Sequence, residues 1–278
     1  MERIDALRQI ADQAQHGELI FPTGLDLAMK LVKQLDDPDC HIDLAAQLIR
    51  NDPLICARVL AIANSAAYNR SGQTISDIRV AVARIGLRMT RCTAVAIATR
   101  QMAGEPKVPQ LRQAALQLWS HTAHVAALAQ VIARRITHLD PETAFFAGIV
   151  HEIGGFYLIS RAEAYPSLIQ GDPADWAEYA EPLIGKQILD KLAVPANVTE
   201  ALERTWEGLL SLPPVSLSDT VLLANQLAPV TSPLHDTKES ALLHQTHDID
   251  AVVDDAFISS ILEESRAEVD SLSKALHF

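Results

Sequence analysis

Apolar residues recur three or four positions apart along most of the chain, which is the period of an amphipathic α-helix. Near the N-terminus, Ile4, Leu7 and Ile10 follow this spacing, and Leu27, Leu31 and Leu35 repeat it with four-residue steps. No segment shows the sustained alternation of apolar and polar residues that is typical of a half-buried strand. The pattern therefore predicts an all-helical protein.

Prolines, glycines and acidic turns divide this pattern into separate helices. In the first part of the chain, helices are expected at 2–16, 24–36, 42–50, 54–64, 77–84 and 87–103, the last two meeting at Gly86. In the second part they are expected at 110–136, 141–151, 156–164, 174–190, 196–206, 216–227 and 250–276. Gly154-Gly155 is expected to interrupt the chain after the second of these, and residues 228–248 to form an irregular loop.

The stretch from Gly104 to Pro109, with two prolines, is the best candidate for a linker between two halves. The length of 278 residues allows one large domain or two small ones. We therefore expect two helical lobes, an N-terminal one covering residues 1–108 and a second one covering residues 109–278.

Composition supports a globular protein in a reducing compartment. Hydrophobic residues make up 49% of the chain and aromatic residues only 5%, which suits closely packed helices with an aliphatic core. The N-terminus has no apolar segment typical of a signal peptide. The chain also has no run of about 18 apolar residues, so no membrane span is expected. Cys40, Cys56 and Cys92 form no paired motif, so free thiols and a cytoplasmic location are expected.

The charges of the chain limit the classes of partner that it is expected to bind. The formal net charge of −12 disfavours general nucleic-acid binding, because a phosphate backbone is repelled. Arg84, Arg88 and Arg91 are spaced four and three apart, which predicts a basic stripe on one helical face. Docking of an acidic protein partner, binding of a phosphate-bearing messenger and a simple solvated face all remain open for this stripe, and a nucleic-acid groove is a less favoured alternative.

Two histidines in strongly apolar segments carry the candidate chemistry. His121 lies within the helix expected at 110–136, and His151 ends the helix expected at 141–151 and is followed by Glu152. Neutral imidazole is a good ligand for divalent metals, and a carboxylate adds an oxygen ligand. The alternative is a pair of hydrogen-bonded core histidines. His124, one turn after His121, is either a further ligand or a histidine satisfied elsewhere.

The segments LWSHTAHVAALAQVIARR and AFFAGIVHEIGGFYLI resemble the HD phosphohydrolase superfamily. Members of that superfamily are helical bundles that bind metal through a His…His-Asp…Asp set and hydrolyse phosphate esters. The resemblance places His121 and His151 at the two histidines, Glu152 at the first aspartate and Asn225 at the last. Gly155 stands where a lysine is common.

Both aspartates are therefore changed. The extra methylene of Glu152 displaces the carboxylate by about 1.5 Å, and a metal bond tolerates only about 0.2 Å, so the backbone would have to adjust. Asn225 offers a neutral oxygen in place of a charged one, which weakens a site for a hard cation. The expectation is a residual, weak metal site formed by His121, His151, Glu152 and Asn225, with no catalytic residue assigned.

The first half of the chain is similar to the HDOD domain. The segments NDPLICARVLAIANSAAYN and ISDIRVAVARIGLRMTRCTAV carry this likeness, which extends with the second half over roughly residues 15–210. It implies a two-lobed helical bundle, with an N-terminal HDOD lobe, an HD-like bundle and a C-terminal helical extension. It also implies a non-catalytic module of bacterial signal transduction that binds a protein partner or a small regulatory ligand and needs no cofactor beyond a weak divalent metal. The alternative is a metal-dependent phosphohydrolase acting on a phosphate ester or nucleotide.

Overall fold

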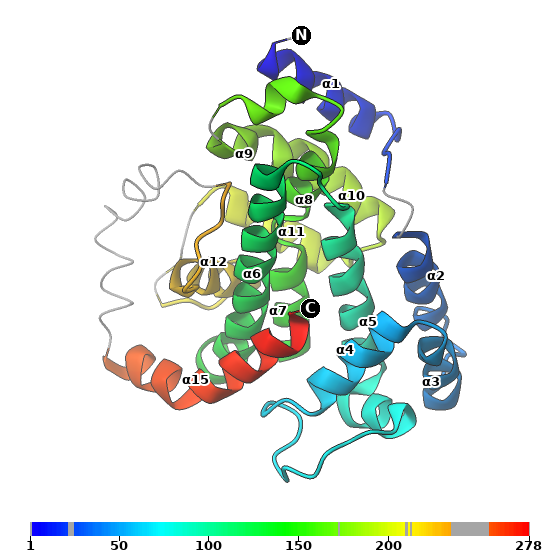
Figure 1. The fold of residues 1–278 in the computed structure, drawn as a ribbon. Coiled ribbons are helices and arrows are strands. Elements are labelled where there is room, and N and C mark those ends of the chain that lie inside the picture. The colour runs from blue at the N-terminus through cyan, green and yellow to red at the C-terminus, as the bar shows by residue number, and fades with distance from the viewer. Residues whose placement is uncertain are drawn as a thin grey trace.

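The computed structural model describes residues 2–21, 25–171, 173–208, 211, 213–234 and 256–277, and these residues form helices joined by turns, without a strand. The first part contains α1 (Arg3–Gln15), α2 (Leu25–Leu35), α3 (Ile42–Arg50), α4 (Pro53–Ala63) and α5 (Ile78–Met102). The second contains α6 (Pro109–Ile132), α7 (Pro141–Val150), α8 (Ile153–Arg161), α9 (Ala177–Tyr179), α10 (Lys186–Lys191), α11 (Ala196–Trp206), α12 (Leu217–Leu227) and α15 (Ala256–Leu276). The predicted all-helical fold is confirmed (Figure 1).

Local sequence signals set where many of these helices begin. The side chains of Asp52, Asp77 and Asp140 accept hydrogen bonds from backbone N–H groups in the first turns of α4, α5 and α7. Ser216 does the same for α12, and Asp219 bonds back to it to complete a capping box. These side chains satisfy N–H groups that have no partner within the helix.

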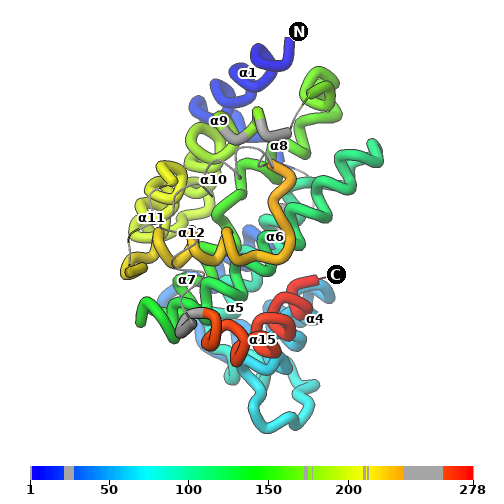
Figure 2. The backbone as a smooth tube through the Cα atoms, turned by 90° about the vertical axis from the view of Figure 1, so that its left-hand side faces the viewer, coloured from blue at the N-terminus to red at the C-terminus, as the bar shows by residue number. Residues whose placement is uncertain are grey.

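The centre of the molecule is the packing of α6 against α7, which lie side by side in Figures 1 and 2. Buried alanines line α6, and Gly148 of α7 lies so close to it that an added Cβ would be 2.6 Å from the Cα of Ala126. This close approach positions the candidate site, because α6 carries His121 and α7 leads into His151.

Helix α5 breaks at Gly86, whose φ of 81° and ψ of 165° are not helical, so the predicted junction between two helices is confirmed. Only glycine adopts this conformation without strain. As a whole, α5 packs against α2, α3 and α4, and also against α7 and α8 of the second part. The C-terminal α15 likewise contacts both α4 and α6. The division into two domains at residue 108 remains a prediction.

Two details differ from the sequence analysis. The helix break expected at Gly154-Gly155 was wrong: the chain turns three residues earlier, at His151-Glu152, and both glycines lie buried inside α8. The single helix expected at 174–190 is instead a 3₁₀ turn at Pro173–Trp176, the short α9, a π-helical turn at Ala180–Gly185 and α10. The expected loop at 228–248 is described only as far as residue 234, and the expected residues 250–255 of the last helix lie outside the described part.

One described segment, Pro141–Arg161, is long and apolar enough to cross a membrane by length and composition alone. However, 89% of its most apolar window is buried within the protein, as is typical of a core helix. Its composition is therefore explained by its place in the fold. The cytoplasmic location remains a prediction.

The three cysteines are free thiols, as expected, with Cys40 and Cys92 buried and Cys56 half-buried. Burial raises the pKa of the Cys92 thiol to about 12, so almost none of it is the reactive thiolate near pH 8. We predict that Cys56 reacts first with a thiol reagent in the native protein and that Cys92 reacts only after unfolding. Mass spectrometry of timed alkylation would check this, and rapid native labelling of Cys92 would contradict it.

Candidate metal-binding cluster

The packing of α6 on α7 brings the two predicted histidines together. His121 lies in the middle of α6, and His151 directly follows the last residue of α7. The Nε2 atoms of the two imidazoles are 3.3 Å apart, and the ring centroids are 5.3 Å apart. Residues 30 positions apart in the sequence therefore present the same ring nitrogen to each other.

Glu152 completes the cluster. Its Oε2 atom lies 3.5 Å from Nε2 of His121 and 3.7 Å from Nε2 of His151. One ligand atom from each of the three residues fits within 4.8 Å of the others. The longer side chain is accommodated because Glu152 leaves helical geometry, with φ −122° and ψ 37°, in the turn between α7 and α8.

Hydrogen bonds of the two Nδ1 atoms set the orientation of the imidazole rings. Nδ1 of His121 lies 2.7 Å from the carbonyl oxygen of Val230, and Nδ1 of His151 lies 2.8 Å from that of Gly148. A carbonyl oxygen only accepts hydrogen bonds, so each Nδ1 carries the proton and donates. Both Nε2 atoms then direct lone pairs into the cluster. Their contact is repulsive unless a positive species, either a proton or a metal ion, lies among them.

The spacing of the donors suits a metal ion. Two ligand atoms that each lie about 2.1 Å from one tetrahedral ion are about 3.4 Å apart. The distances of 3.3, 3.5 and 3.7 Å between the three donor atoms bracket this value. Histidines that donate Nδ1–H to a backbone carbonyl are also typical of metal ligands. The residues present therefore fit a divalent cation.

Glu181 is a buried carboxyl group that the sequence analysis did not place at the site. Its Oε1 accepts a hydrogen bond of 2.9 Å from the backbone N–H of Gly155 in the first turn of α8. Burial raises its pKa well above the usual range, and the nearby charge of Glu152 raises it further. Both effects favour the neutral acid, and the hydrogen bond from Gly155 ties Glu181 to the start of α8. The sequence feature that could have identified Glu181 is a carboxyl residue in the apolar stretch before Gly185.

Two further candidate ligands, His124 and Asn225, differ in what the structure shows of them. The ring of His124 bonds to the carbonyl of Ser120 at 2.7 Å and contacts the hydroxyl of Ser273 at 3.3 Å, which confirms the alternative that it is satisfied outside the cluster. Asn225 is half-buried on α12, and among the hydrogen bonds of the described residues none joins it to the cluster. Its role as a ligand remains a prediction.

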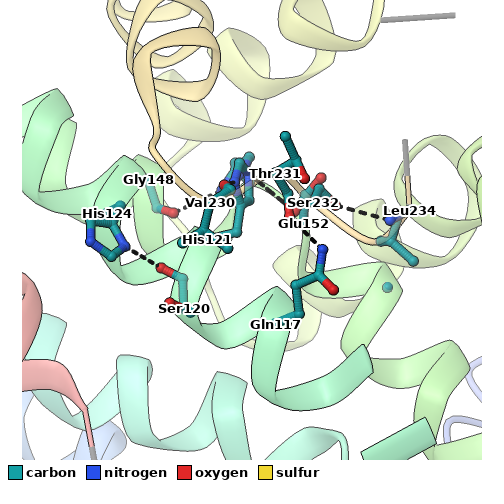
Figure 3. Close-up of polar contacts among 12 residues, drawn as sticks. Gln117, Ser120, His121, His124, Gly148, Glu152, Val230, Thr231, Ser232 and Leu234 are labelled. Carbon is teal, nitrogen blue, oxygen red and sulfur yellow. Dashed lines mark hydrogen bonds and ion pairs between the residues drawn. The ribbon is translucent and has the colours of Figure 1, made fainter. Parts of the chain in front are cut away.

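A segment after α12, here called the strap (residues 228–234), lies over the cluster (Figure 3). Besides the contact between Val230 and His121, the side chain of Gln117 donates to the carbonyl of Thr231 at 3.0 Å. The side chain of Leu234 packs against α8, where a Cβ added to Gly155 would be 2.2 Å from its Cδ1 atom. The strap thus closes the site between α6 and α8.

The three arginines predicted to bind a partner do not form one continuous stripe, because the break at Gly86 separates Arg84 from the other two. Arg88 forms ion pairs with Asp140 and Glu142 of the second part. Arg91 pairs with Asp36, which directly follows α2, and lies over the ring of Phe146, 5.3 Å from its centroid. Their role in binding remains a prediction.

Arg88 and Arg91 line a pocket of about 460 Å³ where α5 meets α7 and the start of α11. Other residues of the lining include Asp36, Glu142, Phe146 and Asn197. The pocket therefore combines two guanidinium groups, two acids, an aromatic wall and an amide.

Residues 21–206 match the family described as the HDOD domain. No curated protein matches the chain. Among solved structures it is similar to a "Putative metal-dependent phosphohydrolase" from Shewanella amazonensis SB2B, with 22% identity, 99% of each chain covered and a TM-score of 0.71. An HDOD domain protein with unknown function from Geobacter sulfurreducens gives 22% identity, 99% coverage of each chain and a TM-score of 0.63. A "Putative signal transduction protein" from Marinobacter aquaeolei VT8 gives 15% identity and a TM-score of 0.59, with 99% of this chain and 65% of that one covered. These likenesses show the shared fold.

Proposed function

The chain belongs to the HDOD family, and on this premise we propose that it is a non-catalytic output module of bacterial signal transduction. In this proposal it binds a small regulatory ligand or a protein partner at the pocket lined by Arg88 and Arg91. A divalent cation at His121, His151 and Glu152 has a structural and regulatory role there, not a hydrolytic one.

The observation that carries the proposal is the contrast between a buried cluster and an open pocket. His121, His151 and Glu152 are 1%, 6% and 3% exposed, and the strap lies over them. Hydrolysis would need a phosphate ester to come within about 3 Å of a metal-activated water. The pocket with Arg88 and Arg91, in contrast, presents exposed and half-buried charged side chains above a buried apolar floor that includes Phe146.

The donor set supports cation binding of modest strength. His121, His151 and Glu152 would hold the ion, and Asn225 remains the proposed fourth ligand. When bound, a divalent cation supplies positive charge and Lewis acidity among these donors. The chain's own contribution is to orient the imidazoles through the carbonyls of Val230 and Gly148. With one charged carboxylate and one neutral amide, the set offers less negative charge than two aspartates would, which favours weak binding.

A metal-dependent phosphohydrolase is the second candidate, and the convergence of the two Nε2 atoms with Oε2 of Glu152 favours it. This alternative requires the strap to leave the cluster so that a phosphate ester or nucleotide can enter. It also requires catalysis with Glu152 as the single carboxylate of the three clustered donors.

The pocket gives the proposal a test. We predict that a phosphate-bearing messenger binds between Arg88 and Arg91, that it is recovered unchanged, and that Arg88→Gln weakens binding about tenfold through loss of a charge-assisted hydrogen bond. Calorimetry with a panel of nucleotides and cyclic dinucleotides would measure the affinity, and chromatography would follow the nucleotide.

Arg204→Gln, which removes an exposed arginine of α11, is the matched control and should leave the affinity unchanged. Equal affinity in wild type and Arg88→Gln would contradict the assignment of this pocket. Consumption of the nucleotide would support the hydrolase alternative.

A further inference from the structure

The strap is anchored to the two helices that flank the cluster, and each anchor is specific. The carbonyls of Val230 and Thr231 accept from the side chains of His121 and Gln117, which lie four residues apart on α6. Leu234 is buried against Gly155 of α8. The hydroxyl of Ser232 accepts from the backbone N–H of Leu234 at 3.2 Å and stabilises the turn between the anchors. The strap is therefore a docked element of the described structure.

His121 connects the strap to the cluster through the two sides of one rigid ring. Its Nδ1 donates to Val230, and its Nε2 lies 3.3 Å from His151 and 3.5 Å from Glu152. The carbonyl of Val230 fixes both the tautomer and the rotation of this ring. If the strap left, the ring would lose the contact that keeps its Nε2 directed toward His151.

We propose that the strap (residues 228–234) is the gate and the positioning element of the cation site, so that docking of the strap and binding of a divalent cation strengthen each other. This inference rests on the proposed cation site and adds its regulation. Because coupling between two events is reciprocal, a cation that favours the docked strap must bind more weakly when the strap is loosened. The occupancy of the buried site is thereby transmitted to the chain that follows α12, which Figure 2 shows running along α6 toward α8.

The strap also explains how a buried site exchanges its contents. The three donor residues are almost inaccessible while Val230 and Leu234 are in place. Leu234 occupies space that is available only because residue 155 has no side chain. Undocking of Leu234 and release of two hydrogen bonds would open the path between α6 and α8 without unfolding either helix. The gate is thus local, and its anchors can be changed one at a time.

The test combines zinc affinity with hydrogen exchange of the strap in the full chain. We expect Zn²⁺ to slow exchange of the amides of Val230, Thr231, Ser232 and Leu234 about tenfold or more. Loss of a group that orients a metal ligand typically costs 10–100-fold in metal affinity. We therefore expect Leu234→Ala and Gln117→Ala each to weaken Zn²⁺ binding about tenfold, as measured by competition with a chelating dye.

Two matched controls separate gating from general loosening. Leu35→Ala removes a buried leucine of α2, and Gln113→Ala removes an exposed glutamine one turn before Gln117 on α6. Both should keep the wild-type zinc affinity. Two results would contradict the coupling and leave the proposed cation site unaffected. In the first, both strap variants bind Zn²⁺ as tightly as the wild type; in the second, Zn²⁺ does not change hydrogen exchange of the strap amides. If the wild type binds no Zn²⁺, or His151→Ala binds it equally well, the cation site and the coupling both fail.

Discussion

Gly154→Ala is expected to lower the free energy of unfolding by about 3 kcal/mol, at the upper end of the usual cost of overpacking a core. A Cβ at this position would lie 2.0 Å from the carbonyl oxygen and 2.4 Å from the carbonyl carbon of Ala180. Both are backbone atoms, so no side-chain rotation relieves the contact. Either α8 or the π-helical turn at Ala180–Gly185 must move, and that turn holds Glu181 at the start of α8.

Urea unfolding followed by circular dichroism would measure this loss. Gly72→Ala is the matched control, because a Cβ there meets nothing within 4 Å and only its φ of 70° makes alanine unfavourable. Its cost should be about 1 kcal/mol, the usual range for an L-residue in this region. A loss of 1 kcal/mol or less in Gly154→Ala would show that α8 and the Ala180–Gly185 turn are not in the close contact described.

The second large effect concerns the cation. Free Zn²⁺ at about 100 times its dissociation constant should stabilise the protein by about 2.7 kcal/mol, since only the folded chain assembles the cluster. His151→Ala should abolish this gain because it removes one of the two imidazole ligands. The substitution should also remove the repulsion between the two Nε2 atoms that destabilises the metal-free protein. We therefore expect no loss of stability when the metal-free variant is compared with the metal-free wild type.

Thermal unfolding at fixed concentrations of Zn²⁺ and Mn²⁺ would measure this effect. His16→Ala is the control, since His16 is exposed on the first turn after α1 and should leave the metal-dependent gain intact. An equal gain in wild type and His151→Ala would place the bound metal somewhere other than this cluster.

Much of the fold could be predicted because local chemistry decides it. Asp52, Asp77 and Asp140 precede helices that start where their side chains cap them. The periodic segments between them became helices with nearly the predicted bounds. Gly86 was read correctly as a junction, since its break depends on backbone conformation alone.

Gly154 and Gly155 were misread because a glycine can bend a chain or allow close packing, and only the tertiary neighbours decide which. Here the backbone of Ala180 and the side chain of Leu234 fill the space that a Cβ would take. Position 155, where the resemblance to the HD superfamily would place a lysine, thus makes an apolar contact with the strap. No local pattern near either glycine indicates these distant partners.

The clustering of three candidate donor residues could be predicted from the sequence, and their surroundings could not. The apolar helices around His121 and His151 and the adjacent Glu152 pointed to a cluster, and the structure brings these three together. The longer side chain of Glu152 was expected to require an adjustment of the backbone, and the chain does leave helical geometry at that residue. Glu181 and the strap come from segments whose sequence shows no periodic relation to the histidines.

The most direct test is the number of divalent ions bound by the purified protein under saturating metal, measured together with turnover of phosphate esters by the metal-loaded chain. We expect about one bound ion per chain that is lost in His151→Ala, and no hydrolysis of phosphate monoesters, diesters or nucleotides beyond that of the metal-stripped protein. Sustained hydrolysis that requires both the ion and His151 would contradict this expectation.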